Sequence, residues 1–225
     1  MQDADAAPTR TRGFKKKERT RRLLIQAAVD EIATNGEAFT ILDITKRADV
    51  SNGTFYNYFT DREALVDAVI AEVLHSFTET SAELVTTDDP VRRFATISAL
   101  LLEHGAANPQ LATVLLRLQS IVHASAMADD PFGHLRDDLA EAVKQRRLTR
   151  EPSDASIDLV IGTLFQAVLR LTTTTTTTEY RRDVICVLLE SFGLEPSEAA
   201  EIAADAVAHA PELERAYREA ETAGT

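Results

Sequence analysis

The sequence predicts an all-α protein, with a small N-terminal domain of three helices followed by a larger helical domain. Three observations support this fold class. The 225 residues include only 8 glycines and 7 prolines, apolar residues recur at the three- and four-residue spacing of helices, and no segment alternates polar and apolar residues over the length of a strand. Frequent Ala, Leu and Glu, which are good helix formers, agree with this prediction.

The first two helices are delimited by their capping residues. Apolar residues at helical spacing predict a helix over about 18–34, which ends at Asn35-Gly36 because Gly readily takes the left-handed conformation that follows a helix. The pattern Thr40-Ile41-Leu42-Asp43 is a capping box, in which each end residue bonds the other's backbone. It predicts a short second helix over 40–48.

Two further capping patterns predict the next helices. Ser51 is a good N-cap for a third helix over 52–59. Thr60-Asp61-Arg62-Glu63 is a second capping box, and it begins a long amphipathic helix that reaches about residue 85. The chain therefore opens with three short or medium helices and enters its larger domain on a long one.

Pro at the first helical position marks three later helices. Asp89-Pro90, Asn108-Pro109 and Asp130-Pro131 each place a capping residue before a proline. The helices expected from these signals cover residues 90–106, 108–127 and 131–147.

The C-terminal third contains two broadly apolar helices and an extension. We expect helices over 154–172 and 179–193, the second ending at Gly193. The threonine tract 172–178 is expected to fray one helix end and to link the two, because β-branched residues are mediocre helix formers. The Ala- and Glu-rich tail is expected to form one or two surface helices broken near Pro211.

Charge is distributed unevenly along the chain. The net charge is −12, yet eight basic residues and one acid lie between Arg10 and Arg22. A basic arm on an acidic body is typical of a phosphate-binding module, although a solvated tail is an equally simple interpretation of the arm alone. No membrane span or secretory signal is expected, and a single cysteine, Cys186, excludes a disulfide framework or a Cys-based zinc site.

Residues 40–59 have the organisation of a helix-turn-helix, whose second helix enters the DNA major groove. Phe55 and Phe59 lie one turn apart and can anchor this helix inward. At about 100° per residue, Gly53 and Asn57 then lie on the opposite face. The alternative is a three-helix subdomain with an aromatic core and no DNA-binding role.

The segment from Phe39 to Phe59, with Asp61-Arg62-Glu63-Ala64-Leu65 after it, resembles the N-terminal signature of the TetR/AcrR family of bacterial transcriptional regulators. The pattern Ala-x-Val-Ser-x-Gly-Thr-x-Tyr-x-x-Phe carries the resemblance, which covers about residues 18–70. The chain departs from the family pattern at Asp49, where Gly is common, at Tyr58, where His is frequent, and at Arg62, where Lys usually contacts phosphate.

The resemblance implies a homodimer that binds a palindromic operator in double-stranded DNA, usually to repress, and is released when a small-molecule effector fills a pocket. The lack of a secretory signal predicts a cytoplasmic protein, and the usual lining of pockets predicts a largely apolar effector. A regulator that activates, or that binds DNA constitutively, is the alternative. No cofactor is expected. The implied domains are a flexible basic arm (1–17), a DNA-binding domain (18–63), a ligand-binding and dimerisation domain (64–195) and a helical extension (196–225).

Candidate residues follow for three kinds of site. Those expected to contact DNA are Lys15, Lys16, Lys17, Thr40, Ser51, Asn52, Gly53, Thr54, Tyr56, Asn57, Tyr58 and Arg62. Those expected to face the effector are His104, Arg117, Gln119, His123, Gln166 and Arg170. Those expected at the dimer interface are Ile161, Phe165, Val168, Val184, Ile185 and Leu188.

An enzyme is the first competing class, and a helical interaction protein without DNA binding is the second. No metalloprotease His pair, phosphate-cradling Gly loop or Gly-x-Ser-x-Gly elbow occurs, and the five histidines are scattered. The basic arm and the recognition helix argue against the second class. We therefore expect a regulator rather than an enzyme.

Overall fold

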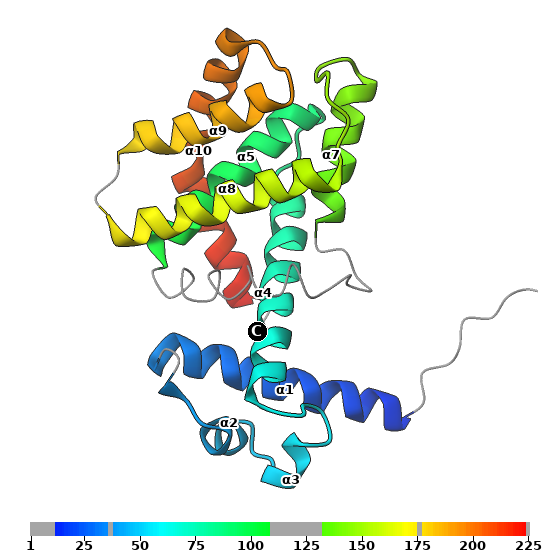
Figure 1. Ribbon diagram of the computed structural model, residues 1–225. Coiled ribbons are helices and arrows are strands. Elements are labelled where there is room, and N and C mark those ends of the chain that lie inside the picture. Colours follow the sequence, from blue (N-terminus) through cyan, green and yellow to red (C-terminus); the bar gives the residue numbers. More distant parts are fainter. Residues whose placement is uncertain (1–11, 36–37, 109–131, 175–176, 224–225) are drawn as a thin grey trace, which may run out of the picture. The chain divides into compact units, whose positions relative to one another are not determined.

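The computed structural model describes residues 12–35, 38–108, 132–174 and 177–223 (Figure 1). These residues form helices and no strand, which confirms the predicted all-α class. The chain divides into an N-terminal unit, residues 1–72, and a C-terminal unit, residues 73–225. Each unit has its own buried core.

The N-terminal unit contains α1 (Arg12–Asn35), α2 (Ile41–Arg47), α3 (Asn52–Phe55) and the first part of α4 (Arg62–Leu84). Helix α2 contacts both α1 and α3. Side chains from all four helices meet in a core without solvent access. The fully buried members are Leu24, Ala28, Ile44, Phe55 and Leu65.

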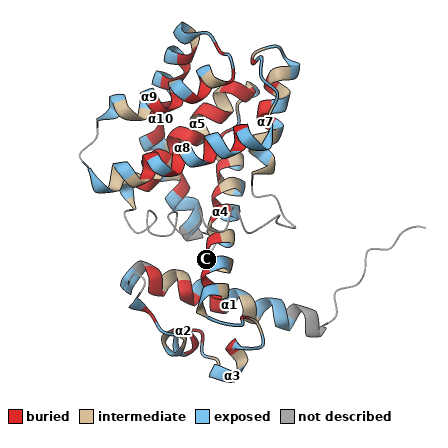
Figure 2. Ribbon diagram, in the orientation of Figure 1, coloured by how far each residue is buried: buried red, intermediate tan, exposed pale blue. Residues whose placement is uncertain are grey.

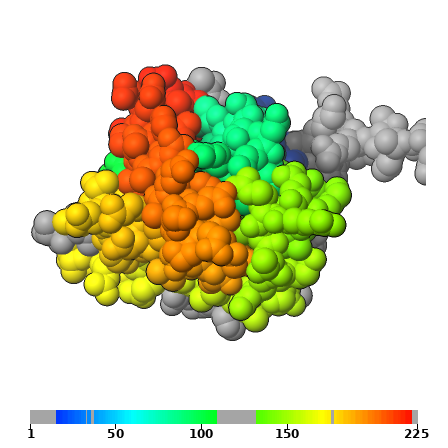
Figure 3. Space-filling model, turned by 90° about the horizontal axis from the view of Figure 1, so that it is seen from above, coloured from blue at the N-terminus to red at the C-terminus, as the bar shows by residue number. Residues whose placement is uncertain are grey.

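The C-terminal unit is organised around one central helix. It contains the rest of α4, then α5 (Pro90–Ala107), α7 (Gly133–Lys144), α8 (Asp154–Thr173), α9 (Thr178–Ser191) and α10 (Pro196–Ala223). Helix α5 contacts α7, α8, α9 and α10, and Figure 2 shows buried residues along its length. Figure 3 shows α7, α9 and α10 on the outer surface.

Several predicted caps are confirmed at atomic detail. Thr40 and Asp43 form the capping box of α2, and Ser51 accepts a hydrogen bond from the backbone of Thr54 at the start of α3. Asp89 caps α5 with Pro at its first helical position. Gly193, with φ +88°, follows α9 in the left-handed conformation expected of it.

Two boundaries differ from those expected. Helix α1 begins at Arg12 rather than near Glu18, since Lys and Arg are themselves good helix formers, so part of the expected flexible arm is helical. Helix α3 ends at Phe55, because Asn57 and Tyr58 turn to tighter three-residue hydrogen bonds. The caps expected at 108–109 and 130–131 lie wholly or partly outside the described residues.

The second capping box is also corrected. Asp61, and not Thr60, caps α4: its Oδ1 accepts the Ala64 N–H at 2.7 Å. Asp61 bonds the backbone three residues ahead, which is the reach of an N-cap side chain. Thr60 instead donates its hydroxyl to the Asp61 carboxylate.

Helix α10 is continuous through Pro211, where the sequence predicted a break. A proline inside a helix loses one hydrogen bond and crowds the preceding turn, but tertiary packing holds this helix together. Tyr217 is buried with Phe77 and Leu100 in one cluster, and Ala210 is buried as well. The tail is therefore a packed part of the C-terminal unit, in contact with α5 and α9.

Helix α8 is the one described helix that is long and apolar enough to cross a membrane, by length and composition. Half of its apolar window is buried inside the protein, so the core packing described above accounts for its composition.

Candidate functional site

The helix-turn-helix begins at a capping box that also uses the Thr40 side chain. Asp43 Oδ2 accepts hydrogen bonds from the Thr40 backbone N–H at 2.9 Å and from its hydroxyl at 2.6 Å. These bonds, the hydroxyl first, lower the pKa of Asp43 because they favour its charged form. Thr40 itself is exposed, with its hydroxyl proton directed at Asp43.

The turn between α2 and α3 depends on a left-handed residue. Asp49 has φ +52°, the conformation that glycine adopts without strain. The Val50 N–H bonds the Thr45 carbonyl at 3.0 Å and the Asp49 N–H bonds that of Lys46 at 3.3 Å, which is the Schellman pattern of a helix end. Asp49 thus keeps the geometry of a turn where related sequences commonly have Gly.

Helix α3 separates buried aromatic side chains from exposed polar ones. Phe55 is fully buried and Phe59 nearly so, with ring centroids 5.7 Å apart. Of the residues expected to contact DNA, Ser51, Asn52, Gly53, Tyr56 and Asn57 are exposed, while Thr54 and Tyr58 are half-buried. The exposed set is compatible with a face that reads DNA, and its contacts with bases remain a prediction.

The basic residues expected at the phosphates have different surroundings. Lys16 and Lys17 are exposed on α1, whereas the Lys15 side chain lies outside the described residues. Arg62 stacks its guanidinium over the Phe39 ring, 4.3 Å from the centroid. Stacking fixes the direction of this cation while leaving its charge in place.

An ion pair between α1 and α2 was not expected from the sequence. Arg47 Nε donates to Glu31 Oε1 at 2.8 Å, and Asn35 donates to the other carboxylate oxygen. The Arg47 hydrogen bond is the main cause that lowers the pKa of Glu31. This pair ties the first helix of the DNA-reading motif to α1.

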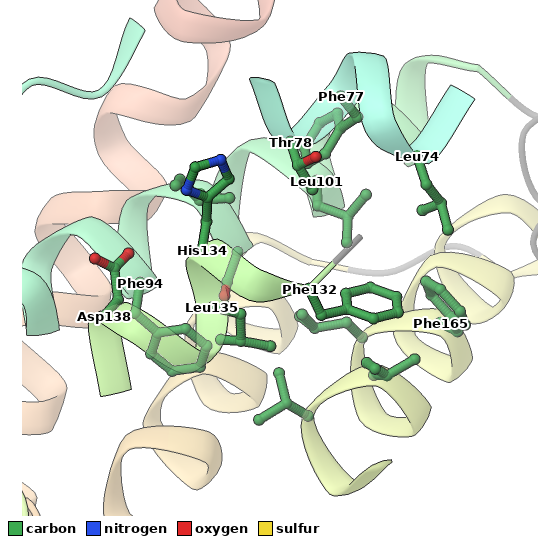
Figure 4. A pocket seen from close by; sticks show the side chains of 15 residues that line it. Leu74, Phe77, Thr78, Phe94, Leu101, Phe132, His134, Leu135, Asp138 and Phe165 are labelled. Carbon is green, nitrogen blue, oxygen red and sulfur yellow. The ribbon is translucent and has the colours of Figure 1, made fainter. Parts of the chain in front are cut away.

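The C-terminal unit contains an apolar cavity of about 90 Å³. Aromatic and aliphatic side chains from α4, α5, α7 and α8 form most of its wall, with Phe132 just before α7 (Figure 4). Figure 4 shows Leu74 and Phe165 at one end and His134 and Asp138 at the other. An apolar wall with few polar groups is typical of small-molecule sites.

A second hollow of about 250 Å³ adjoins the polar end of the apolar cavity. The two share Ile97, His134 and Asp138. Asp138 Oδ1 accepts a hydrogen bond from Arg93 at 2.5 Å, and burial, only partly offset by Arg93, raises the pKa of Asp138. Asp138 lines both hollows, whereas Arg93 and Asp88 line only the second.

The residues expected to face the effector are not brought together here. Gln166 and Arg170 are exposed on α8, and Arg117, Gln119 and His123 lie outside the described residues. His104 places its Nδ1 2.9 Å from Glu214 and packs against Tyr217. Within the described part of the chain, none of the six lines either hollow.

The residues expected at the dimer interface lie in the core of this chain, and their part in a dimer stays a prediction. All six are buried inside one protomer, and they are Ile161, Phe165, Val168, Val184, Ile185 and Leu188. The wide apolar faces of α8 and α9 are covered by the other helices of the same chain. Outward-facing positions on these two helices are different, and include Leu159 and Val187, which are 46% and 60% exposed.

Comparison with known proteins identifies the N-terminal unit. Residues 24–69 match the family described as bacterial regulatory proteins, tetR family. The N-terminal unit of the chain therefore contains a tetR-family domain. Over 68 residues it is 34% identical to YvdT of Bacillus subtilis (strain 168), described as an uncharacterised HTH-type transcriptional regulator; this match spans 29% of the chain and 35% of that relative.

Solved structures extend the likeness over both units of the chain. RolR in complex with resorcinol is 28% identical, with a TM-score of 0.66 over 84% of this chain and 95% of that one. RolR without ligand gives 26% identity and a TM-score of 0.67, over 81% and 95%. A gamma-butyrolactone receptor, 20% identical with a TM-score of 0.51 over 88% and 98%, shares the fold.

The polar residues of the two hollows were not predicted from the sequence, because these residues come from separate helices. Arg93 lies on α5 and Asp138 on α7, 45 positions apart. The only signal in the sequence is that each charge stands among apolar residues of an amphipathic helix, as Asp138 does next to Leu139. Helical periodicity alone does not pair them.

Proposed function

We propose that this chain is a cytoplasmic transcriptional repressor that binds a palindromic operator as a homodimer and dissociates when a small, largely apolar effector fills the cavity. One observation carries the proposal. Helix α4 contributes Leu74, Phe77 and Thr78 to the cavity wall and also starts, at Arg62, within the DNA-reading unit. An effector that shifts α4 therefore acts on a helix that both units share.

The size and lining of the cavity support a small effector. A cavity of about 150 Å³ holds benzene, and the two hollows measure about 90 and 250 Å³. RolR, the similar protein above, was crystallised with resorcinol, a single aromatic ring with two hydroxyl groups. We propose an effector of the same size class for this chain.

Dimerisation is proposed through the outward faces of α8 and α9. Leu159 and Val187 are large apolar side chains left exposed there, and a Cβ at Gly162 would meet open space. A two-fold interface buries such a surface against its own copy, and two recognition helices then read the two half-sites of a palindrome.

The dimer interface is tested by sedimentation at micromolar concentration. Leu159→Asp or Val187→Asp should shift the protein toward the monomer mass, because an unpaired charge would be buried between protomers. Ala204→Asp, at an exposed position on α10, is the matched control and should leave the mass unchanged. If the variants on α8 and α9 stay dimeric, the interface lies elsewhere.

DNA binding and its release are tested together. A duplex selected from a random pool gives the operator, and titration at several salt concentrations gives the number of phosphate contacts. Lys16→Gln and Lys17→Gln should each weaken binding to every duplex and reduce the log–log salt slope by about one unit. Lys144→Gln, on α7, is the control. Failure of the intact protein to bind any duplex, or binding that no cavity ligand weakens, would contradict the repressor.

A further inference from the structure

Asp138 has one oxygen engaged and one available. Its Oδ1 accepts a hydrogen bond from Arg93 Nη1, while Oδ2 accepts none from any described residue. Arg93 is oriented by the Thr87 carbonyl, which accepts from Nε at 3.1 Å and from Nη2 at 2.6 Å. The guanidinium is thus held at one oxygen, and among the described residues the second oxygen has no donor at the junction of the two hollows.

The carboxylate of Asp138 is already paired with a cation. The Arg93 cation neutralises the Asp138 carboxylate at contact distance. Nearby, Asp88 lines the second hollow, and Glu79 faces His134 at 3.2 Å. A ligand carboxylate would meet the anionic Asp138 oxygen and further acids, while a ligand cation would lose its hydration and meet the Arg93 cation already bound to Asp138.

From this geometry we propose that the effector carries a neutral hydroxyl on an apolar ring, and that the hydroxyl donates its proton to Asp138 Oδ2. The ring lies between Phe94, Leu101 and Phe165 and extends into the adjoining second hollow, because the apolar cavity alone is smaller than the roughly 150 Å³ that holds benzene. Asp138 is then the residue that selects hydrogen-bond donors over carboxylates. The proposal rests on the proposed role of this cavity as the effector site.

Single-ring probes test this selectivity on the intact protein. Phenol carries a hydroxyl that can donate a hydrogen bond, and anisole has the same ring and oxygen but no such proton. Benzoate carries an anionic carboxylate, and benzylamine carries a cationic amine. Calorimetric titration should give phenol an affinity on the order of 10- to 100-fold above anisole, the range for a hydrogen bond to a charged group. Benzoate and benzylamine should bind more weakly than phenol.

Two Asp→Asn variants on the same helix test the residue. Asp138→Asn removes the acceptor charge and leaves Arg93 uncompensated, so the preference should reverse from phenol to benzoate. Asp137→Asn makes the same chemical change at an exposed neighbour and should keep the preference for phenol. Circular dichroism and duplex binding show whether each variant folds. If Asp138→Asn does not fold, the probe series on the intact protein still decides.

The outcomes separate this inference from the proposed function. Equal binding of phenol and anisole, or tighter binding of benzoate or benzylamine, overturns the role of Asp138 while leaving an effector cavity in place. Retention of the phenol preference in Asp138→Asn overturns it as well. If no probe binds while the protein still binds its operator, the hydroxyl-ring proposal fails and DNA recognition stands.

Discussion

Gly105 of α5 allows a close approach of this helix to α8, and its replacement by Ala tests that packing. A Cβ at this position would lie 2.6 Å from Cγ1 and 2.9 Å from Cγ2 of Val168 on α8, well inside the contact distance of about 3.5–4.0 Å between carbon atoms. Val168 is fully buried, so it has no solvent to move into. The added methyl must therefore displace packed atoms.

Two effects of opposite sign decide the result of Gly105→Ala. Overpacking costs about 1–3 kcal/mol, whereas replacing Gly by Ala inside a helix stabilises it by up to about 1 kcal/mol. We expect the free energy of unfolding to fall by up to about 2 kcal/mol. Urea denaturation followed by circular dichroism, at one protein concentration because dimerisation changes apparent stability, measures it.

A double-mutant cycle with Val168→Ala separates the clash from helix propensity. Val168→Ala alone should cost about 2 kcal/mol through lost burial and the space that it leaves. In the double variant the methyl added at position 105 enters that space, so the two costs should not add, and a coupling of about 1–3 kcal/mol is expected. Gly133→Ala, whose Cβ would meet nothing within 4 Å, is the control. Additive effects, with Gly105→Ala at least as stable as the parent, would refute the close approach.

The remaining predictions concern recognition, the turn and alkaline stability. Asn57→Ala should cost about 1–3 kcal/mol of binding free energy on the selected operator and little on random DNA. Equal loss of affinity for both duplexes, at unchanged stability, would show that Asn57 does not lie on the base-reading face. Phe55→Ala should destabilise the N-terminal unit by about 3–5 kcal/mol. Asp49→Gly should relieve left-handed strain and raise the free energy of unfolding by about 0.5–1 kcal/mol, which raises the melting temperature. Asp49→Ala should lower the melting temperature. Burial, with the nearby Glu221 and Glu214, raises the pKa of Tyr217 above its ordinary value of 10.0. The unfolded chain therefore loses this proton first, and stability should fall as pH rises through about 10; Tyr217→Phe should flatten that fall in urea midpoints at pH 8 to 11, whereas Tyr180→Phe should not.

Local signals in the sequence predicted the helix-turn-helix with most of its detail. A cap needs only a side chain and a backbone N–H two or three positions apart, as at Asp89 and Ser51. Thr60 was wrongly predicted as the cap of α4 because both it and its neighbour Asp61 have side chains that can cap a helix. In the structure Asp61 accepts the hydrogen bond from the Ala64 N–H. Propensity alone could not show that packing of Tyr217 carries α10 past Pro211.

The neighbouring helices of the same chain, and not the sequence of α8 alone, decide which face of α8 points inward. Both of its sides carry apolar residues, so the pattern fitted a helix shared between two protomers as well as one enclosed by its own chain. Contacts with α5 and α9 bury Ile161 and Phe165, and this turns Leu159 and Gln166 outward. The same rotation removes Gln166 from the cavity and leaves Asp138, contributed by α7, as its charged acceptor. A polar residue of the cavity can therefore be assigned only after the neighbours of each helix are known, because the pairing of Arg93 with Asp138 exists only once α5 and α7 are in contact.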